Sequence, residues 1–206
     1  MCCLARDSGG HGPQRKQARC PGRKPSRDPV REAVRENEQM TTPTPFTLRA
    51  AVLRDVGAIV QLIRDLAEFE KLTHLVQVTP EKLRPQLFGE RPAAEAMVAE
   101  AGGEVVAFAL FFTNFSTFLA QPGLYLEDLY VKPAHRSSGI GRALLTRLAA
   151  LAVERQYGRF EWSVLDWNES ATRFYEGMGA TVLPEWRICR TTGDALVAMS
   201  TAQRLA

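Results

Sequence analysis

The sequence lacks the features that define several large protein classes. No run approaches the ~18 apolar residues that a membrane-spanning helix requires, so we expect no transmembrane role. Cysteine is scarce, since Cys2, Cys3 and Cys20 lie close to the N-terminus and Cys189 is the one cysteine in the remainder. This spacing supports neither a disulfide framework nor a metal-ligand set, and we therefore expect no bound metal.

A surplus of basic charge is also missing from most of the chain. The formal net charge is +3, but residues 1–40 hold 9 Lys and Arg against 5 Asp and Glu, which leaves 17 basic and 18 acidic residues beyond them. Nucleic-acid binding requires a basic face, so we expect no nucleic-acid partner and no membrane partner. The length of 206 residues suits one domain with a hydrophobic core. We also expect the protein to be cytoplasmic.

The first 45 residues contain little that could form a core. They are rich in Arg, Gly, Pro and Ser and have few aromatic or branched apolar side chains, so burial cannot offset the entropy of ordering them. We predict a disordered tail over residues 1–45 and one folded domain over residues 46–206. Met40 stands just before strand-like sequence and is an alternative translational start.

Hydrophobic periodicity predicts an α/β fold in which strands and helices alternate. Two glycines at 102 and 103 lie between β-rich runs and predict a hairpin. The predicted strands are Phe46–Ala50, Ala96–Glu100, Val105–Asn114, Leu124–Val131, Arg159–Leu165, Val182–Arg190 and Ala195–Met199. The predicted helices are Asp55–Lys71, a helix capped by Thr79 and ending near Phe88, Gly141–Gln156 and Ser170–Met178.

A glycine-containing loop joins the strand Leu124–Val131 to the helix that follows it. Its sequence is Arg136-Ser137-Ser138-Gly139-Ile140-Gly141. Glycines that open a helix let backbone N–H groups approach an anion, and Arg136 adds a positive charge, so the loop suits a pyrophosphate. A Walker loop would end in Gly-Lys-Ser/Thr, and a dinucleotide fingerprint would place Gly or Ala at Leu144. A plain helix-capping turn is the remaining alternative.

Several segments, taken in order, resemble the GNAT acetyltransferases. The loop resembles the Arg-x-x-Gly-x-Gly/Ala acetyl-CoA motif of that family. Other segments are similar to its spermidine/spermine and thialysine N-acetyltransferase branch: Leu66–Leu72, Leu126–Val131, Leu165–Glu169 and Phe174-Tyr175. The resemblance extends over residues 46–199. It implies the GNAT fold, with a mixed central β-sheet splayed at the acetyl-CoA site and helices on both faces, and it implies a homodimer.

The resemblance also implies the chemistry and the cofactor contacts. The expected reaction transfers acetyl from acetyl-CoA to a primary amine of a small polyamine-like or lysine-like molecule, by direct attack in a ternary complex. Tyr175 would be the general acid, because a phenol with a pKa near ~10 is protonated at neutral pH; a core aromatic is the alternative. The expected cofactor-binding residues are Leu129, Val131, Arg136, Ser137, Ser138, Gly139, Ile140, Gly141, Arg142 and Asn168. Asn168 is equally suited to capping the helix from Ser170.

The acceptor site is expected around Glu127, which would bind the substrate ammonium or accept its proton through water. Asp128 would face the opposite side of the strand and serve the structure. Glu185 and Trp186 match residues near the acceptor pocket, with a buried aromatic as the alternative for Trp186. Acidic residues on the first helix form either a solvated face or an amine-attracting rim: Asp65, Glu68 and Glu70.

The acceptor itself stays open at this stage. Polyamine acetyltransferases have adjacent acidic residues where this chain has Thr73-His74, which removes one attraction for a long polycation. Acetylation of a protein N-terminus or lysine is an alternative function. A catalytically idle CoA-binding regulatory module is another, although Tyr175 and Glu127 argue against it.

Overall fold

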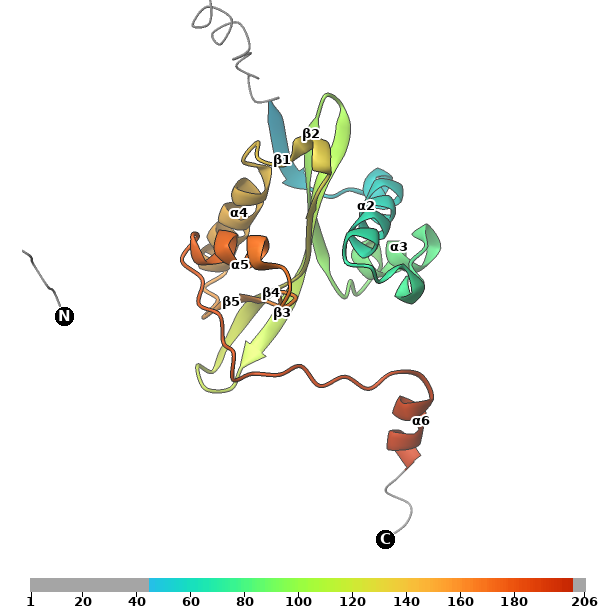
Figure 1. Ribbon diagram of the computed structural model, residues 1–206. Coiled ribbons are helices and arrows are strands. Elements are labelled where there is room, and N and C mark those ends of the chain that lie inside the picture. Colours follow the sequence, from blue (N-terminus) through green and yellow to red (C-terminus); the bar gives the residue numbers. More distant parts are fainter. Residues whose placement is uncertain (1–44, 202–206) are drawn as a thin grey trace, which may run out of the picture. The chain divides into compact units, whose positions relative to one another are not determined.

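A five-stranded sheet with helices on both faces forms the body of the protein, as the computed structural model in Figure 1 shows. The structure describes residues 45–201. The tail predicted over residues 1–45 and the alternative start at Met40 lie outside the described residues, apart from Pro45, and stay predictions. Among the described residues, no helix has both the length and the apolar character needed to cross a membrane.

The sheet is mixed. Its strands are β1 (Phe46–Ala50), β2 (Glu95–Ala101), β3 (Glu104–Ser116), β4 (Gln121–Val131) and β5 (Phe160–Trp162), and they lie in this order across the sheet. The first four are antiparallel neighbours, whereas β5 is parallel to β4. Gly102 and Gly103 connect β2 to β3 with φ of 59° and 82°, as the tight hairpin turn requires. The predicted hairpin is therefore confirmed.

Helices α2 (Val56–Phe69) and α3 (Pro80–Phe88) lie on one face of the sheet, and α4 (Ile140–Glu154) and α5 (Glu169–Glu176) lie on the other (Figure 1). Short 3-10 turns are η1 (Leu53–Asp55), η2 (Thr73–Leu75) and η3 (Pro133–His135). Each face has its own hydrophobic core, one built on α2 and α3 and one built on α4. The fold predicted from the sequence, a mixed sheet between helices, is confirmed.

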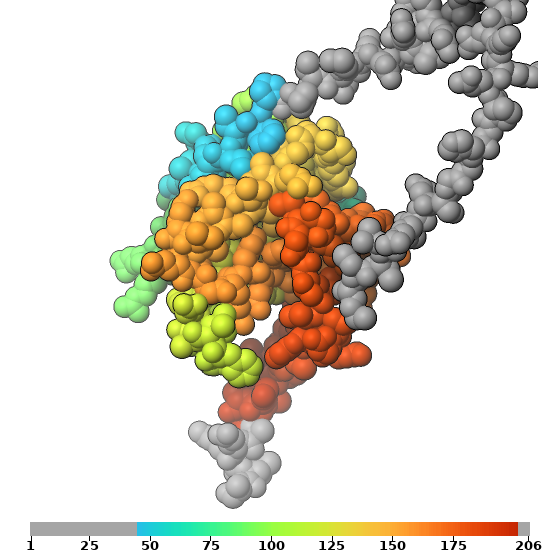
Figure 2. Space-filling view, turned by 90° about the vertical axis from the view of Figure 1, so that its left-hand side faces the viewer, coloured from blue at the N-terminus to red at the C-terminus, as the bar shows by residue number. Residues whose placement is uncertain are grey.

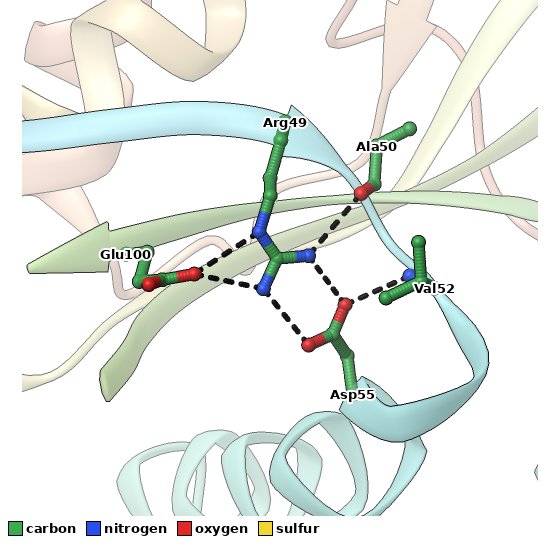
Figure 3. A network of polar contacts seen from close by, with 5 residues as sticks. All are labelled: Arg49, Ala50, Val52, Asp55 and Glu100. Carbon is green, nitrogen blue, oxygen red and sulfur yellow. Dashed lines mark hydrogen bonds and ion pairs between the residues drawn. The ribbon is translucent and has the colours of Figure 1, made fainter. Parts of the chain in front are cut away.

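A network of ion pairs joins β1 and β2 to the start of α2 (Figure 3). Arg49 on β1 contacts the carboxylates of Asp55 and Glu100. Asp55 is only 4% exposed and also accepts the backbone N–H of Val52 at 2.8 Å. The buried carboxylate is thus fully surrounded by donors, and the network fixes where α2 leaves the sheet.

The two terminal strands predicted over Val182–Arg190 and Ala195–Met199 are wrong. Residues 182–190 form no strand, and residues 195–199 lie within α6 (Gly193–Thr201). Every residue from 181 to 201 is exposed. A β-prone pattern forms a strand only where a neighbouring strand takes up its backbone hydrogen bonds, and here this segment finds none within the described chain. The strand predicted over Arg159–Leu165 is real but shorter, since β5 covers only Phe160–Trp162.

Candidate active site

The sheet opens between β4 and β5. The two strands pair only where Leu124–Leu126 meets Phe160–Trp162, while β4 continues to Val131. The N–H of Lys132 donates to Val106 on β3, so the peptide groups of Val131, one residue before it, point to the opposite edge. Past Leu126, the edge of β4 that faces β5 is therefore open, which is the splay that the sequence resemblance implies.

A β-bulge interrupts β4 at Glu127. Leu110 of β3 pairs with Asp128 and Phe111 pairs with Leu126, which leaves Glu127 without a partner in the ladder. A one-residue insertion reverses which residues face each side of the sheet. Before the bulge, Leu126 belongs to the core on the α4 side; after it, Tyr130 belongs to the core on the α2 side.

The bulge turns Asp128 toward helix α2, on the same side as Tyr130. There the charge of Glu70, the residue that directly follows α2, acts on Asp128. Burial, with added repulsion from Glu127 and Glu70, raises the pKa of Asp128 to about 6. Burial also raises the pKa of the Glu70 carboxyl. The sequence suggested a structural role for Asp128 and a peripheral one for Glu70, but the structure brings both into one acidic cluster.

Tyr175 lies on α5 at the same place. Its ring stands 5.1 Å from the Trp162 ring and 5.4 Å from the Phe174 ring, measured between centroids. Burial and the nearby charge of Glu70 raise the pKa of the Tyr175 phenol above its ordinary value of 10. The phenol is therefore protonated throughout the neutral range. Of the two predicted catalytic residues, Tyr175 thus packs beside Trp162 on β5, and Glu127 lies on β4, the strand that separates from β5 past Leu126.

The predicted anion loop leads from β4 into α4. Ser137 and Gly139 have φ of 62° and 88°, and the first bond within the helix runs from the N–H of Ala143 to the carbonyl of Gly139. The N–H groups of the first turn precede that bond, so they are available to a ligand, and the dipole of α4 adds positive potential there. These groups belong to Ile140, Gly141 and Arg142, all predicted cofactor-binding residues.

Helix α5 packs against the beginning of α4, because Phe174 of α5 lies beside Gly141. In Figure 2 the orange and red-orange parts of the chain adjoin on the surface. A side-chain carbon built on Gly141 would lie 3.8 Å from the ring of Phe174 and 3.9 Å from Val131. These are ordinary contact distances, so Gly141 tolerates a methyl group. This packing brings the start of α4 next to α5, the helix that carries Tyr175.

Arg136 has contacts that its sequence position did not predict. Its guanidinium carbon lies 4.9 Å from the centre of the Phe69 ring and 5.6 Å from that of Tyr130. Its Nε donates to the carbonyl of Val131 at 3.1 Å. Phe69 in turn packs on Trp167, with centroids 5.8 Å apart. Arg136 therefore lies where the end of α2 meets the open edge of β4, and not over the first turn of α4.

The remaining predicted residues are placed as follows. The side chain of Asn168 caps α5, accepting the N–H of Ala171 at 3.2 Å, which confirms the capping alternative and leaves its cofactor role a prediction. Ser138 donates to the carbonyl of His135 and braces the loop. Glu185 and Trp186 lie in the exposed C-terminal segment, with Trp186 73% exposed, and their acceptor role stays a prediction. No cluster of three or more potential metal ligands occurs within residues 45–201.

The chain is similar to known proteins over most of the described residues. A family model described as "Acetyltransferase (GNAT) family" matches residues 59–180. The L-ornithine N5-acetyltransferase NATA1 of Arabidopsis thaliana is 36% identical over 197 residues, covering 74% of this chain and 86% of that protein. The thialysine N-epsilon-acetyltransferase of Mus musculus is 39% identical over 160 residues, covering 72% of this chain and 94% of that protein.

A solved structure supports the fold independently. An integron cassette protein from V. cholerae superposes with a TM-score of 0.65 at 22% identity, covering 76% of this chain and 98% of that one. At this level of identity the likeness concerns the fold alone.

Proposed function

The chain belongs to the acetyltransferase (GNAT) family, and from that membership we propose that it transfers acetyl from acetyl-CoA to a primary amine of a small polyamine-like or lysine-like acceptor. The observation that carries this proposal is that the charge of Glu70 acts on both Tyr175 and Asp128, where β4 carries the bulge at Glu127 and separates from β5. Carboxylates suit an amine acceptor, and a protonated phenol suits a departing thiolate.

Acetyl-CoA fits the residues that line this opening. The free N–H groups at the start of α4 suit the pyrophosphate, because they combine unpaired donors with the helix dipole. The open edge of β4 at Leu129 and Val131 offers peptide groups to the amide-containing pantetheine arm. Arg136, which lies where the end of α2 meets the open edge of β4, adds positive charge there. We therefore assign Arg136, Ser137, Ser138, Gly139, Ile140, Gly141, Arg142 and Asn168 to this co-substrate.

The acidic cluster attracts the acceptor amine and removes its extra proton. A primary amine arrives as an ammonium ion, because its pKa lies near that of lysine, about 10.4. Glu70 and Asp128 attract the cation, and Glu127, exposed in the bulge, takes its proton through water. The neutral nitrogen then attacks the thioester carbonyl carbon while both substrates are bound.

Tyr175 completes the transfer. As the new C–N bond forms, the C–S bond breaks, and the phenol donates its proton to the departing sulfur. The attacking nitrogen then loses its remaining extra proton, which returns to the phenolate of Tyr175 and yields the neutral amide. The raised pKa of Tyr175 guarantees that this proton is present at neutral pH. Cys189 is exposed in the C-terminal segment, so direct transfer without an acyl-cysteine intermediate is the simpler course.

The named relatives favour an acceptor of amino-acid type. One is named for ornithine and the other for thialysine, and both molecules carry a primary amine at the end of a short side chain. A short acceptor also agrees with Thr73-His74, where acidic residues that would attract a long polycation are missing.

Thiol release from acetyl-CoA tests the proposal. The full chain is assayed with ornithine, lysine, thialysine, putrescine, spermidine and short peptides, beside Tyr175→Phe and Tyr157→Phe. Loss of one proton donor costs about 100-fold in kcat, so Tyr175→Phe should be nearly inactive. Tyr157, whose hydroxyl contacts Thr113 on the exposed side of β3, is the matched control and should leave kcat unchanged.

Other outcomes would support the alternatives. Labelling of peptides without turnover of free amines would indicate a protein N-acetyltransferase. Binding of acetyl-CoA without thiol release from any acceptor would indicate a regulatory module. Equal activity in Tyr175→Phe and the wild type would remove Tyr175 from the mechanism.

We further propose that the protein is a homodimer in which the segment over residues 181–201, the C-terminal arm, binds a second copy. Seven large apolar side chains of the arm are exposed: Val182, Leu183, Trp186, Ile188, Leu196, Val197 and Met199. Large apolar side chains exposed in this number favour association. The arm also carries the predicted acceptor residues Glu185 and Trp186, so association offers a way to bring them to a site.

Light scattering during gel filtration tests the dimer. The full chain should elute with twice the mass of one chain, and a variant ending at Ala180 should elute with the mass of one. A full chain of monomer mass at micromolar concentration would contradict the proposal.

A further inference from the structure

The segment that ends α2 has an unusual residue next to the acidic cluster. Lys71 follows Glu70 and has a left-handed backbone, with φ of 62°. Its N–H donates to the carbonyl of Glu68, and the N–H of Leu72 donates to that of Ala67 at 2.8 Å, which together form a Schellman cap. Glycine is the usual residue at this position, because a side chain costs about 1 kcal/mol there.

A second helix of the chain ends in the same kind of cap with a different residue. Gln156 follows α4 with φ of 58°, and the N–H of Tyr157 donates to the carbonyl of Ala152 at 2.8 Å. The two caps share one backbone geometry. What distinguishes Lys71 is its place, since Phe69 contacts Trp167 and Arg136, and Glu70 contributes to the field at Asp128 and Tyr175.

The acidic cluster consists of carboxylates. Glu70, Glu127 and Asp128 attract an ammonium group but repel a carboxylate. An amino-acid acceptor carries both, so its carboxylate needs a cation at the mouth of the site. Arg136 is stacked on two rings and donates to Val131. Lys71 is exposed, and among the described residues no carboxylate lies within ion-pair distance of it.

We propose that Lys71 is a specificity-determining residue that binds the α-carboxylate of an amino-acid acceptor while the acidic cluster holds its terminal amine. The inference rests on the proposed function, because it concerns the acceptor of that same reaction. Contact between Lys71 and the α-carboxylate gives the enzyme a preference for ornithine over putrescine and for lysine over cadaverine. The members of each pair share the same amine-bearing chain and differ in the α-carboxylate.

The experiment measures kcat and KM of the full chain for these four amines, in the wild type, Lys71→Gly, Lys71→Met and Gln156→Gly. A charge-assisted contact is worth about 1.5–3 kcal/mol, so both Lys71 variants should raise KM for ornithine and lysine about tenfold or more. KM for putrescine and cadaverine should stay the same or fall, because a repelling cation is removed. Gln156→Gly relieves the same backbone strain at the end of α4 and should change no KM.

The outcomes separate this inference from the proposed function. One contrary outcome is that the wild type acetylates putrescine as efficiently as ornithine, and another is that the Lys71 variants change KM for both amines equally. In either case Lys71 does not bind the α-carboxylate, and the acetyltransferase proposal still stands. If the wild type releases no thiol with any of the four amines, both proposals fail. A higher Tm in Lys71→Gly with no change in KM would show that the lysine is only a cap.

Discussion

The guanidinium of Arg49 donates two hydrogen bonds to the carboxylate of Asp55, from Nη1 to Oδ2 at 2.6 Å and from Nη2 to Oδ1 at 2.9 Å (Figure 3). The pair joins β1 to the turn before α2, and Glu100 on β2 contacts the same guanidinium. The end of α2 carries Phe69 and then Glu70, so the direction in which this helix leaves the sheet determines where part of the active site lies.

Removing Arg49 should therefore be costly. Arg49→Leu leaves the Asp55 carboxylate, 4% exposed, without its cation, and loss of one partner of a buried pair costs about 3–5 kcal/mol. Urea unfolding measures the change. Arg173→Ala is the control, because its pair with Glu169 is exposed at both ends, and it should change the free energy of unfolding by less than about 0.5 kcal/mol. Equal effects of the two substitutions would contradict this account.

The same pair predicts a dependence on acid. The Arg49 side chain holds the pKa of Asp55 below its ordinary value of 3.8 in the folded state. The ionised carboxylate thus stabilises the fold above about pH 4, and this contribution is lost as the pH falls through the lower, folded pKa. The stability advantage of the wild type over Asp55→Asn should shrink steadily below pH 4. An advantage that is constant from pH 7 to pH 2 would show that charge is not its source.

Asp128 should behave in the opposite way. Its pKa is raised to about 6, so ionising it in the folded state costs more than in the unfolded chain. The stability of the wild type should therefore fall as the pH rises from about 3.8 to 6. Asp128→Asn removes the cost and should stabilise the protein at pH 7 by up to about 3 kcal/mol, while weakening the binding of the acceptor amine.

Thermal unfolding at pH 3.5 and pH 7, with KM for the amine, tests this prediction. Glu161→Gln is the control, because Glu161 is a carboxylate of β5 that pairs with Arg159 outside the acidic cluster. Destabilisation of Asp128→Asn at pH 7 would mean that the carboxylate is well compensated in the fold.

The two glycines of the anion loop should differ in their effect on KM for acetyl-CoA. Gly139 has φ of 88°, where a side chain costs about 1–2 kcal/mol, so Gly139→Ala should shift the first-turn N–H groups and raise KM for acetyl-CoA about tenfold. At Gly141 an added methyl group meets only ordinary contacts, and Gly141→Ala should change this KM less than about twofold. Steady-state kinetics with varied acetyl-CoA compares the two. The reverse order would mean that phosphates bind elsewhere.

Much of the fold could be predicted from the sequence, because it follows from local rules. The turn at Gly102 and Gly103 needs positive φ, and the caps at Thr79 and Asn168 each satisfy a backbone N–H three residues away. The helices show apolar spacing of 3.6 residues. The anion loop belongs to the same class, since Gly139 and the first turn of α4 are neighbours in the chain.

Features that depend on distant partners could not be predicted in this way. The bulge at Glu127 arises from the register between β3 and β4, and it alone decides that Asp128 turns toward Glu70. The position of the Arg136 side chain depends on its contact with Phe69, which is 67 residues earlier in the chain. The apolar pattern of the C-terminal arm predicted strands, but a strand exists only where an edge is available to pair with it.

The sequence by itself determined the order of elements, the turns, the anion loop and the family, because each depends on neighbouring residues or on a recognisable pattern. The tertiary structure decided which charges meet. A one-residue bulge reverses the facing of every later side chain in β4, and burial then sets the pKa values of Asp128, Glu70 and Tyr175. Those values depend on distances through space, which the order of residues along the chain does not contain.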